Sequence, residues 1–260
     1  MRTLRLSDSG RINVLGVGFD NVTLDSALRL ITDHIKTDAG FASVYTPNAD
    51  IVELCRRDKT GSLYGIFASA SLSVPDGIGI VKASRILGTP LSERVAGIEL
   101  GSKLLERAAE DGIPVYFLGG AEGIAEEAAK RIRLRIPSLN VAGVHHGYFD
   151  KSGADSDAVL RLIGESGAKL LLVCFGAPTQ EKWIHNNADE LANAGVACAI
   201  GLGGSFDVWS GKIRRAPRFF CDHGLEWLYR SLSRPSRIGR IASVCRFGCA
   251  VIREKRLSRP

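Results

Sequence analysis

The sequence contains no apolar run long enough to cross a membrane. A spanning helix needs about 18 or more consecutive apolar residues, and no run in this chain reaches that length. The first eleven residues, MRTLRLSDSGR, also lack the hydrophobic segment of a secretory signal peptide. These absences argue against helical membrane spans and against export, and they predict a cytoplasmic location.

Several motifs that carry common chemistry are missing too. There is no Walker loop, no H-E-x-x-H sequence and no G-x-G-x-x-G turn, which weakens the case for a P-loop enzyme, a zinc protease or a nicotinamide-binding protein. The six cysteines form no C-x-x-C pair. Cys245, Cys249 and a distant His223 would make a poor set of zinc ligands. We therefore expect no metal ion and no cofactor.

One acidic pair needs separate consideration. Asp155 and Asp157 resemble the D-x-D motif of metal-dependent sugar transferases. They stand at the expected start of a polar helix, where carboxylates cap the chain and interact favourably with the helix dipole. We interpret them as helix-start residues, so they do not alter the expectation of metal-independent chemistry.

Charge is distributed unevenly along the chain, whose net charge is +6. Residues 212–260 contain 13 Lys or Arg against 3 Asp or Glu, whereas the first 211 residues are slightly acidic. A basic tail predicts an anionic partner, either nucleic acid or an acidic membrane surface. Few aromatic residues interleave with the charges and no nucleic-acid-binding motif is present. We therefore expect no nucleic acid as the partner, although the charge pattern by itself leaves both partners open.

Along the first 211 residues, continuous apolar segments alternate with segments whose apolar residues have helical spacing. Strands are expected at 13–19, 41–45, 70–74, 113–118, 141–144, 169–175 and 196–202. Helices are expected at 23–35, 49–57, 63–68, 78–87, 97–110, 124–136, 155–165 and 179–191. The strands are continuous apolar runs, which is typical of strands covered on both faces. The pattern predicts a three-layer α/β domain with a mainly parallel sheet over 1–211, and a basic helical appendage over 212–260.

Polar or glycine-rich turns follow six of these strands, at 46–48, 76–79, 119–123, 146–148, 176–180 and 203–207. Ligands of such sheets bind at the carboxyl ends of the strands, so the turns should line one crevice. Glycine turns that lead into helices offer backbone N–H groups to phosphate, and three such turns together favour a nucleotide diphosphate. A tight strand-to-helix turn would explain each glycine cluster equally well.

Asp76 occupies the break between an apolar strand and the next helix, in the sequence Pro75-Asp76-Gly77. The simple interpretation is that it caps the helix. The alternative is a general base, because metal-free transfer of a sugar from a diphosphate needs one base and a cationic or backbone stabiliser of the leaving group. Arg94 and the arginines of the tail supply cations, although each alone could be a surface charge.

The motifs occur in the order seen in the WecG/TagA/CpsF family (glycosyltransferase family 26), which this chain resembles from about residue 13 to residue 237. The matching segments are Thr46-Pro47-Asn48-Ala49-Asp50, Pro75-Asp76-Gly77, Arg94-Val95-Ala96-Gly97, Gly119-Gly120, Gly147-Tyr148-Phe149, Gly176-Ala177-Pro178-Thr179-Gln180-Glu181-Lys182-Trp183, Gly203-Gly204-Ser205-Phe206-Asp207, Arg215-Ala216-Pro217 and Gly224-Leu225-Glu226-Trp227-Leu228-Tyr229-Arg230.

The resemblance implies an inverting bacterial glycosyltransferase with a Rossmann-like fold of its own type. Such an enzyme transfers N-acetylmannosamine, its uronic acid or glucose from a UDP-sugar to a sugar on polyprenyl diphosphate, at the inner face of the cytoplasmic membrane. The products are cell-surface polysaccharides such as teichoic acid or exopolysaccharide.

The resemblance also implies roles for individual residues. Asp76 would be the general base. Residues expected near the substrate sugars and diphosphate are Thr46, Asn48, Arg94, Gln180, Arg215, Arg230 and Arg237. Residues expected at the UDP part of the donor are Gly119, Gly120, Tyr148, Gly176, Gly203, Gly204 and Asp207.

Alternatives remain for the position of the C-terminal helix and for the function of the protein. Ile238, Ile241, Cys245 and Ile252 have helical spacing among arginines, which fits a basic amphipathic helix at a membrane interface. The same helix could instead pack on the body with a solvated basic face. A nicotinamide-dependent oxidoreductase and a nucleic-acid-binding protein remain alternative functions, and the pattern leaves open whether the chain forms a homo-oligomer.

Overall fold

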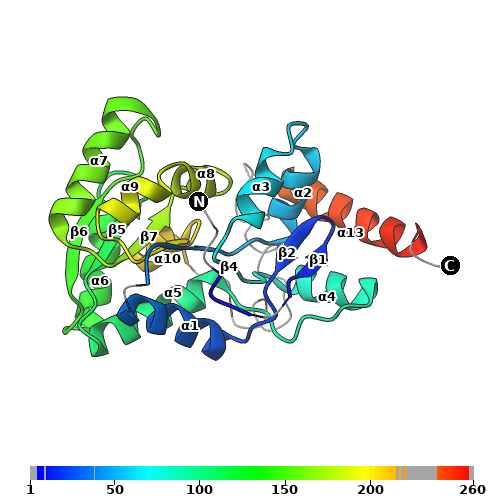
Figure 1. Ribbon diagram of the computed structural model, residues 1–260, viewed down its shortest axis with the longest axis horizontal. Coiled ribbons are helices and arrows are strands. Elements are labelled where there is room, and N and C mark those ends of the chain that lie inside the picture. The colour runs from blue at the N-terminus through cyan, green and yellow to red at the C-terminus, as the bar shows by residue number, and fades with distance from the viewer. Residues whose placement is uncertain are drawn as a thin grey trace.

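The structure is a computed structural model that describes residues 5–257 except 9, 38, 215, 216, 218, 219 and 221–238. At its centre lies a sheet of six strands in the order β4-β3-β8-β7-β5-β6 (Figure 1). The strands are β3 (Ala42–Tyr45), β4 (Leu72–Ser73), β5 (Val115–Gly119), β6 (Val141–His145), β7 (Leu170–Cys174) and β8 (Cys198–Gly201). All five neighbouring pairs are parallel, which confirms the predicted sheet.

Helices cover both faces of the sheet, as the apolar strands predicted. One hydrophobic cluster includes residues of α1 (Leu24–Thr37), α5 (Gly97–Glu110), α6 (Ile124–Arg135) and α10 (Ser205–Trp209). The other includes residues of α2 (Ala49–Arg57), α3 (Ser62–Ala68), α4 (Ile78–Leu87), α7 (Gly153–Ser166), α8 (Thr179–Asn186), α9 (Ala188–Asn193) and α13 (Gly239–Leu257). Alternate residues of β7 belong to opposite clusters, as the pleat of a strand requires. The three-layer α/β prediction is thus confirmed.

The expected strand at 13–19 is wrong, because this segment is a hairpin. β1 (Ile12–Val14) and β2 (Val17–Phe19) pair antiparallel. The turn consists of Leu15 and Gly16, with φ of 53° and 91°, and positive φ at both positions is what a two-residue hairpin requires. The Asn13 side chain accepts a hydrogen bond from the Gly16 N–H at 2.9 Å. A leucine rarely adopts positive φ, so the turn was not apparent in the sequence.

The expected helix at 179–191 is likewise wrong, because it is two helices. α8 ends at Asn186 and α9 begins at Ala188. Between them, the Asn187 side chain donates to the Trp183 carbonyl at 2.7 Å, a local bond of the kind by which Asn competes with helical geometry. The short helix α10 was not anticipated either. The break ends α8 two turns after the predicted site residue Gln180.

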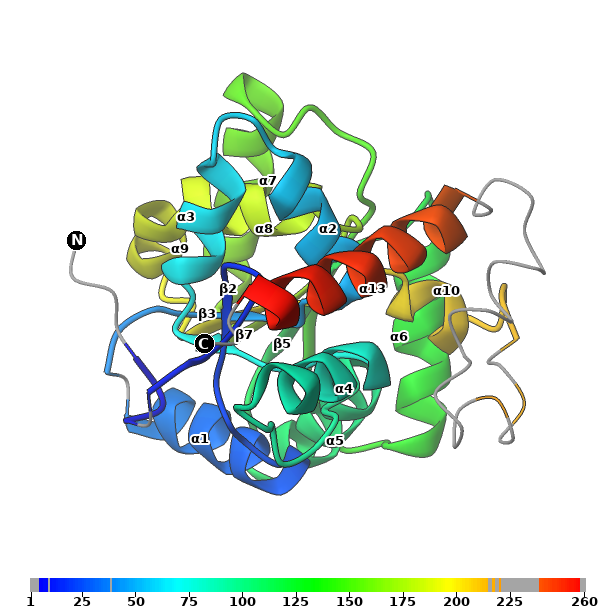
Figure 2. The same ribbon diagram turned by 90° about the vertical axis from the view of Figure 1, so that its right-hand side faces the viewer.

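The C-terminal helix α13 packs across α2 and α4 (Figure 2). Phe247, Ala250 and Val251 form its buried side. Near its middle, Arg246 Nε lies 3.2 Å from Glu53 Oε1 of α2. Of the two positions considered for this helix, the structure therefore shows the one in which it packs on the body of the protein.

The apolar stripe that we expected on this helix is not the one that is buried. Ile252 is 51% exposed and Cys245 is exposed, while Ile241 is half-buried and Ile238 lies outside the described residues. The helix is rotated so that the larger Phe247 enters the core, since burial of an aromatic side chain gains more than burial of a cysteine. No helix in the described part of the chain combines the length and the apolar content needed to cross a bilayer.

Candidate active site

The predicted turns lie along one edge of the sheet, because each follows the carboxyl end of a parallel strand. Across the sheet they run in the order Asp76 after β4, Thr46 and Asn48 after β3, Gly203, Gly204 and Asp207 after β8, Gly176 and Gln180 after β7, Gly119 and Gly120 after β5, and Tyr148 after β6. This edge is the place where α/β sheets bind ligands. We therefore take it as the candidate active site.

Asp76 lies in a turn that is bonded to two other predicted loops. Its N–H donates to the Pro47 carbonyl at 3.1 Å, and the Val95 N–H donates to the Pro75 carbonyl at 3.0 Å. The side chain of Asp76 is partly exposed. The N-cap of α4 is Gly77, whose φ is 98°, so Asp76 precedes the cap position and the simple capping interpretation is wrong. These bonds assemble the loops that carry Asn48, Asp76 and Arg94.

A buried ionic network supports the short strand β4 behind Asp76. The Asp20 carboxylate is fully buried and accepts a hydrogen bond from the Ser73 N–H at 2.8 Å. It lies 2.5 Å from Arg5 Nη2 and 3.2 Å from Arg11 Nε. Arg11 also donates to the Ala70 carbonyl at 2.6 Å. A buried carboxylate is stable only when it is paired, as Asp20 is with the two arginines. Because Asp20 and Arg11 also bond to the backbone of Ser73 and Ala70, the network holds β4 in place. The sequence pattern did not reveal Asp20, whose one local signal is an acid that follows an apolar segment.

Thr46 and Asn48 shape the loop after β3. Thr46 is almost fully buried, and its Oγ1 donates to the Gly201 carbonyl of β8 at 3.0 Å. Asn48 caps α2, and its Oδ1 accepts hydrogen bonds from the N–H groups of Asp50 and Ile51. Within the described part of the chain, the Asn48 Nδ2 group makes no hydrogen bond. Asn48 therefore leaves an amide donor next to the turn of Asp76.

The arginines divide into one that the structure places and three that it does not. Arg94 stands in the loop that bonds Pro75, and its Nη2 lies 3.7 Å from Glu99 Oε1. Its side chain is 22% exposed, so the guanidinium group retains access to solvent. Arg215, Arg230 and Arg237 lie outside the described residues.

Tight packing and positive φ explain the two glycines at the end of β5, of which Gly119 is the last strand residue. A Cβ on Gly120, whose φ is 74°, would lie 2.8 Å from Ile124 Cγ2. A Cβ atom on Gly119, whose φ is 140°, would lie 2.5 Å from the Cys174 carbonyl oxygen. The Gly120 N–H donates to the same oxygen at 3.1 Å, and the Gly147 N–H donates to the Gly120 carbonyl at 2.7 Å. Since the Gly120 N–H already has a partner, it is not available to a phosphate in this arrangement. The tight-turn interpretation accounts for this pair.

Tyr148 is presented by a loop that Lys151 holds in place. Its side chain is 77% exposed, while Lys151 Nζ donates to the carbonyls of Gly147 and Phe149, both at 2.7 Å. The ammonium group also lies 3.7 Å from the centre of the Phe149 ring, and burial lowers the Lys151 pKa. A fixed loop with an exposed aromatic ring offers a platform on which a base can stack. Lys151 was not among the residues that the sequence pattern indicated.

The turns after β7 and β8 are joined by one buried amide. Gln180 is 2% exposed, and its Oε1 accepts a hydrogen bond from the Gly203 N–H at 2.9 Å. Gly176 and Gly203, with φ of 83° and 58°, have open space where a Cβ would stand. Asp207 is partly exposed in the first turn of α10. Gln180 thus braces the site from within, whereas the two glycines leave room for a ligand.

Metal-binding candidates remain weak in the structure. No group of three His, Cys, Asp or Glu side chains in the described residues is arranged to hold a metal ion. The N-cap of α7 is Ser152 and the helix begins at Gly153, so the expectation that the two aspartates cap it is wrong. Asp155 lies in the first turn, where its charge still interacts favourably with the helix dipole. Between the two aspartates, Ser156 is buried and accepts a hydrogen bond from Trp183 Nε1 at 2.9 Å.

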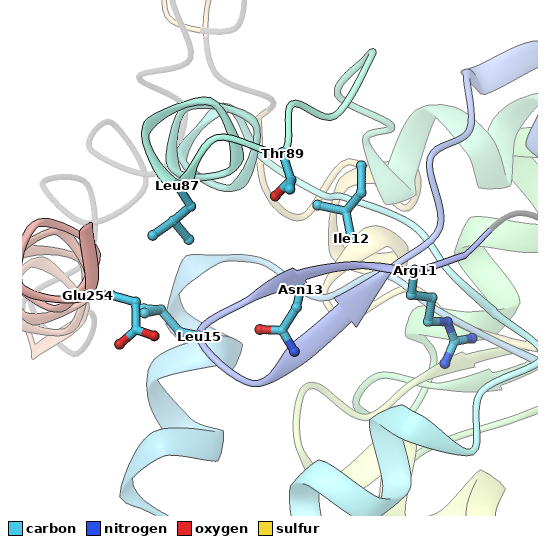
Figure 3. A pocket seen from close by; sticks show the side chains of 7 residues that line it. All are labelled: Arg11, Ile12, Asn13, Leu15, Leu87, Thr89 and Glu254. Carbon is cyan, nitrogen blue, oxygen red and sulfur yellow. The ribbon is translucent and has the colours of Figure 1, made fainter. Parts of the chain in front are cut away.

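Two surface pockets lie away from this edge. One, of about 400 Å³, lies between the β1–β2 hairpin, the end of α4 and α13 (Figure 3), and its walls are Arg11, Ile12, Asn13, Leu15, Leu87, Thr89 and Glu254. The other, of about 570 Å³, lies beside α6 and β6. Neither contains a predicted site residue, so neither is the candidate active site.

Comparison with known proteins tests the resemblance. The profile of the family described as glycosyl transferase WecG/TagA/CpsF matches residues 12–260. A Bacillus spizizenii protein named N-acetylglucosaminyldiphosphoundecaprenol N-acetyl-beta-D-mannosaminyltransferase is 37% identical over 74% of this chain and 72% of its own. A Staphylococcus aureus protein of the same name is 34% identical over 96% of this chain and 95% of its own.

These matches cover both the sheet edge and the tail, and they confirm the resemblance drawn from the turns. They also decide against the oxidoreductase and the nucleic-acid-binding protein as the function of this chain. The chain belongs to the WecG/TagA/CpsF family of glycosyltransferases.

Proposed function

We propose that this glycosyltransferase moves N-acetylmannosamine from a UDP donor to N-acetylglucosamine linked to undecaprenyl diphosphate. The names of the relatives describe this acceptor and this sugar. The UDP donor follows from the family resemblance and from the glycine turns at the sheet edge. The observation that carries the mechanism is the assembly of the Asn48, Asp76 and Arg94 loops by backbone hydrogen bonds at the carboxyl ends of β3 and β4.

In the proposed mechanism Asp76 is the general base. Its carboxylate takes the proton of an acceptor hydroxyl while that oxygen attacks the anomeric carbon of the donor sugar. The bond from that carbon to the diphosphate oxygen breaks on the opposite face, so the configuration inverts and UDP leaves with the electron pair. Asn48 Nδ2 would orient the sugars, and Arg94 would offset the charge that develops on the diphosphate. Thr46 would hold the loop after β3 through its bond to Gly201. We propose that no metal ion is needed.

The rest of the edge would hold the nucleotide. We propose that Tyr148 stacks on the base and that the turns at Gly176 and at Gly203–Gly204 lie against the diphosphate. Gly119 and Gly120 would shape the turn through backbone packing rather than by binding phosphate directly. Arg215, Arg230 and Arg237 of the tail remain candidate partners of the diphosphate, and Gln180 and Asp207 would support the pocket from the body.

We propose that the catalytic domain spans 1–211 and that 212–260 forms an appendage for the membrane surface. The outer side of α13 carries the exposed Arg253 and Arg256 together with exposed Ile252 and Leu257. Basic side chains beside exposed apolar ones suit an anionic lipid interface. In this proposal the protein works on the inner face of the cytoplasmic membrane, where a lipid-linked acceptor would be presented.

The test is a donor panel with a base variant. Wild-type protein, Asp76→Asn and Asp157→Asn are incubated with UDP-sugars and a short-chain polyprenyl diphosphate N-acetylglucosamine, and product mass is read. We expect addition of one N-acetylhexosamine by the wild type and by Asp157→Asn, and a loss of roughly 10²–10⁴-fold in Asp76→Asn. Full turnover by Asp76→Asn would remove Asp76 from the mechanism, and transfer of another sugar would redefine the donor.

A further inference from the structure

A chain of buried polar groups connects α8 to the turn after β8. The Gly203 N–H donates to Gln180 Oε1 at 2.9 Å, and Gln180 Nε2 donates to Glu181 Oε1 at 2.8 Å. Gln180 is 2% exposed and Glu181 is 0% exposed. The Glu181 carboxyl is thus one hydrogen bond removed from an amide that contacts the proposed donor pocket.

The direction of this chain is fixed by chemistry. A backbone N–H can only donate, so the oxygen of the Gln180 amide must face Gly203. Its NH₂ group must then face Glu181, which is an acceptor through Oε1. Any acceptor lost at position 181 leaves a buried NH₂ group unpaired, and the amide loses the contact that prevents it from rotating.

The amide has little space in which to move while both bonds are present. A Cβ on Gly201 would lie 2.8 Å from Gln180 Nε2, so the amide rests directly on the end of β8. From the other side, Thr46 Oγ1 donates to the Gly201 carbonyl at 3.0 Å. The segment from Gly201 to Gly203 is therefore held by side chains that follow both neighbouring strands, β3 and β7.

Glu181 is a costly residue for its position. Its Oε2 atom has no hydrogen-bond partner among the described residues, and burial raises its pKa to about 7. Among the described residues, the ionisable groups beside it include the buried side chains of Tyr45 and Cys55. An apolar side chain of similar size would avoid the buried, unpaired oxygen. A carboxyl at this position therefore calls for an explanation other than stability.

We propose that Glu181 is a positioning residue of the donor site, whose carboxyl holds the Gln180 amide in the orientation that fixes the Gly203–Gly204 turn. This inference rests on the proposed function, in which that turn lies against the diphosphate of UDP. Glu181 does not touch the substrate, and its effect passes through Gln180 to the backbone of the turn.

The experiment compares Glu181→Met with Glu181→Gln. Met fills the volume without an acceptor, whereas Gln keeps a carbonyl oxygen for Gln180 Nε2. For Glu181→Met we expect UDP affinity and the KM for the donor to worsen about ten-fold, the equivalent of one hydrogen bond, with kcat within about three-fold and the melting temperature not lowered. Glu181→Gln should recover most of the lost affinity. Glu181→Asp, which withdraws the acceptor by one methylene, serves if the Met variant does not fold.

Two controls separate positioning from general support of the fold. Ser156→Ala removes the buried hydrogen bond from α7 to Trp183 of α8, the helix that also carries Glu181. This variant should lower stability without changing UDP affinity. The double variant Gln180→Met/Glu181→Met should bind UDP no more weakly than Gln180→Met alone, since the two residues act as one chain.

Three results would contradict the proposal. They are unchanged UDP affinity in Glu181→Met, an equal loss in Ser156→Ala, and additive effects in the double variant. If the wild-type protein does not bind UDP, the proposed function is wrong, and the inference about Glu181, which rests on it, is wrong as well. Wild-type binding that Glu181→Met leaves intact would overturn this inference alone.

Discussion

The two halves of the candidate site are held together in different ways. On the β4–β3–β8–β7 half, buried polar side chains reach across to the backbone of a strand or of the turn after it: Asp20 to Ser73, Thr46 to Gly201 and Gln180 to Gly203. On the β5–β6 half, the backbones of Gly119, Gly120 and Gly147 contact one another or Cys174 directly.

The difference determines how each half responds to mutation. A side chain that bonds to a backbone can be shortened while the chain keeps its path, so its loss costs one hydrogen bond and local order. A glycine in direct contact has less margin, and least at Gly119, where a Cβ must displace main-chain atoms of Cys174. We expect variants of the first half to affect binding and catalysis, and variants of the second half to affect folding first.

The largest effect should come from Gly119→Ala. The new Cβ would lie 2.5 Å from the Cys174 carbonyl oxygen, at a φ of 140° that alanine rarely adopts. We expect the free energy of unfolding in urea to fall by about 4 kcal/mol. The control is Gly123→Ala, which also has positive φ but nothing within 4 Å of its Cβ, and it should cost about 1 kcal/mol. Equal losses in the two variants would show that backbone contact does not set this half apart.

The side-chain half should also make stability depend on pH. Burial raises the Glu181 pKa from 4.5 to about 7, so the folded protein keeps a proton that the unfolded chain releases in this range. The free energy of unfolding should therefore fall as pH rises from about 4.5 to 7 and level off above, by at most roughly 3 kcal/mol. Glu181→Gln cannot titrate and should lack this decline. Parallel curves for the two proteins, measured by denaturation at each pH, would contradict the assignment.

Proline and glycine residues that end strands and helices explain which parts of this fold were predictable from the sequence. The bounds of α4 matched the prediction because Pro75, Gly77 and Gly88 mark its two ends. The turns of the site were located because each follows an apolar strand, and the order of the motifs along the chain was enough to indicate the family.

Long-range partners explain what was not predictable. Gln180 meets Gly203, and Asp20 meets Ser73, across 23 and 53 residues of sequence, and no local pattern records such a choice. Gln180 was predicted to contact the substrate, yet its side chain is buried against β8. The hairpin was missed because it depends on a leucine at positive φ, and the break was missed because it depends on the hydrogen bond of one Asn side chain.

The smallest effect in this comparison should come from Thr46→Val, which keeps the shape of the side chain and removes its hydroxyl. The Gly201 carbonyl then loses the donor that ties β3 to the end of β8, and we expect about 1 kcal/mol less stability and a lower kcat/KM. The matched control is Thr32→Val, whose equally buried hydroxyl bonds within its own helix to the Leu28 carbonyl at 3.0 Å. That bond lies within α1 and connects it to no other helix or strand, and the Leu28 carbonyl also accepts a backbone hydrogen bond of the helix. Its loss should therefore leave kcat/KM unchanged. Full activity in Thr46→Val would show that the edge keeps its form without the cross-strand bond, and the distinction between the two halves would then rest on the glycines alone.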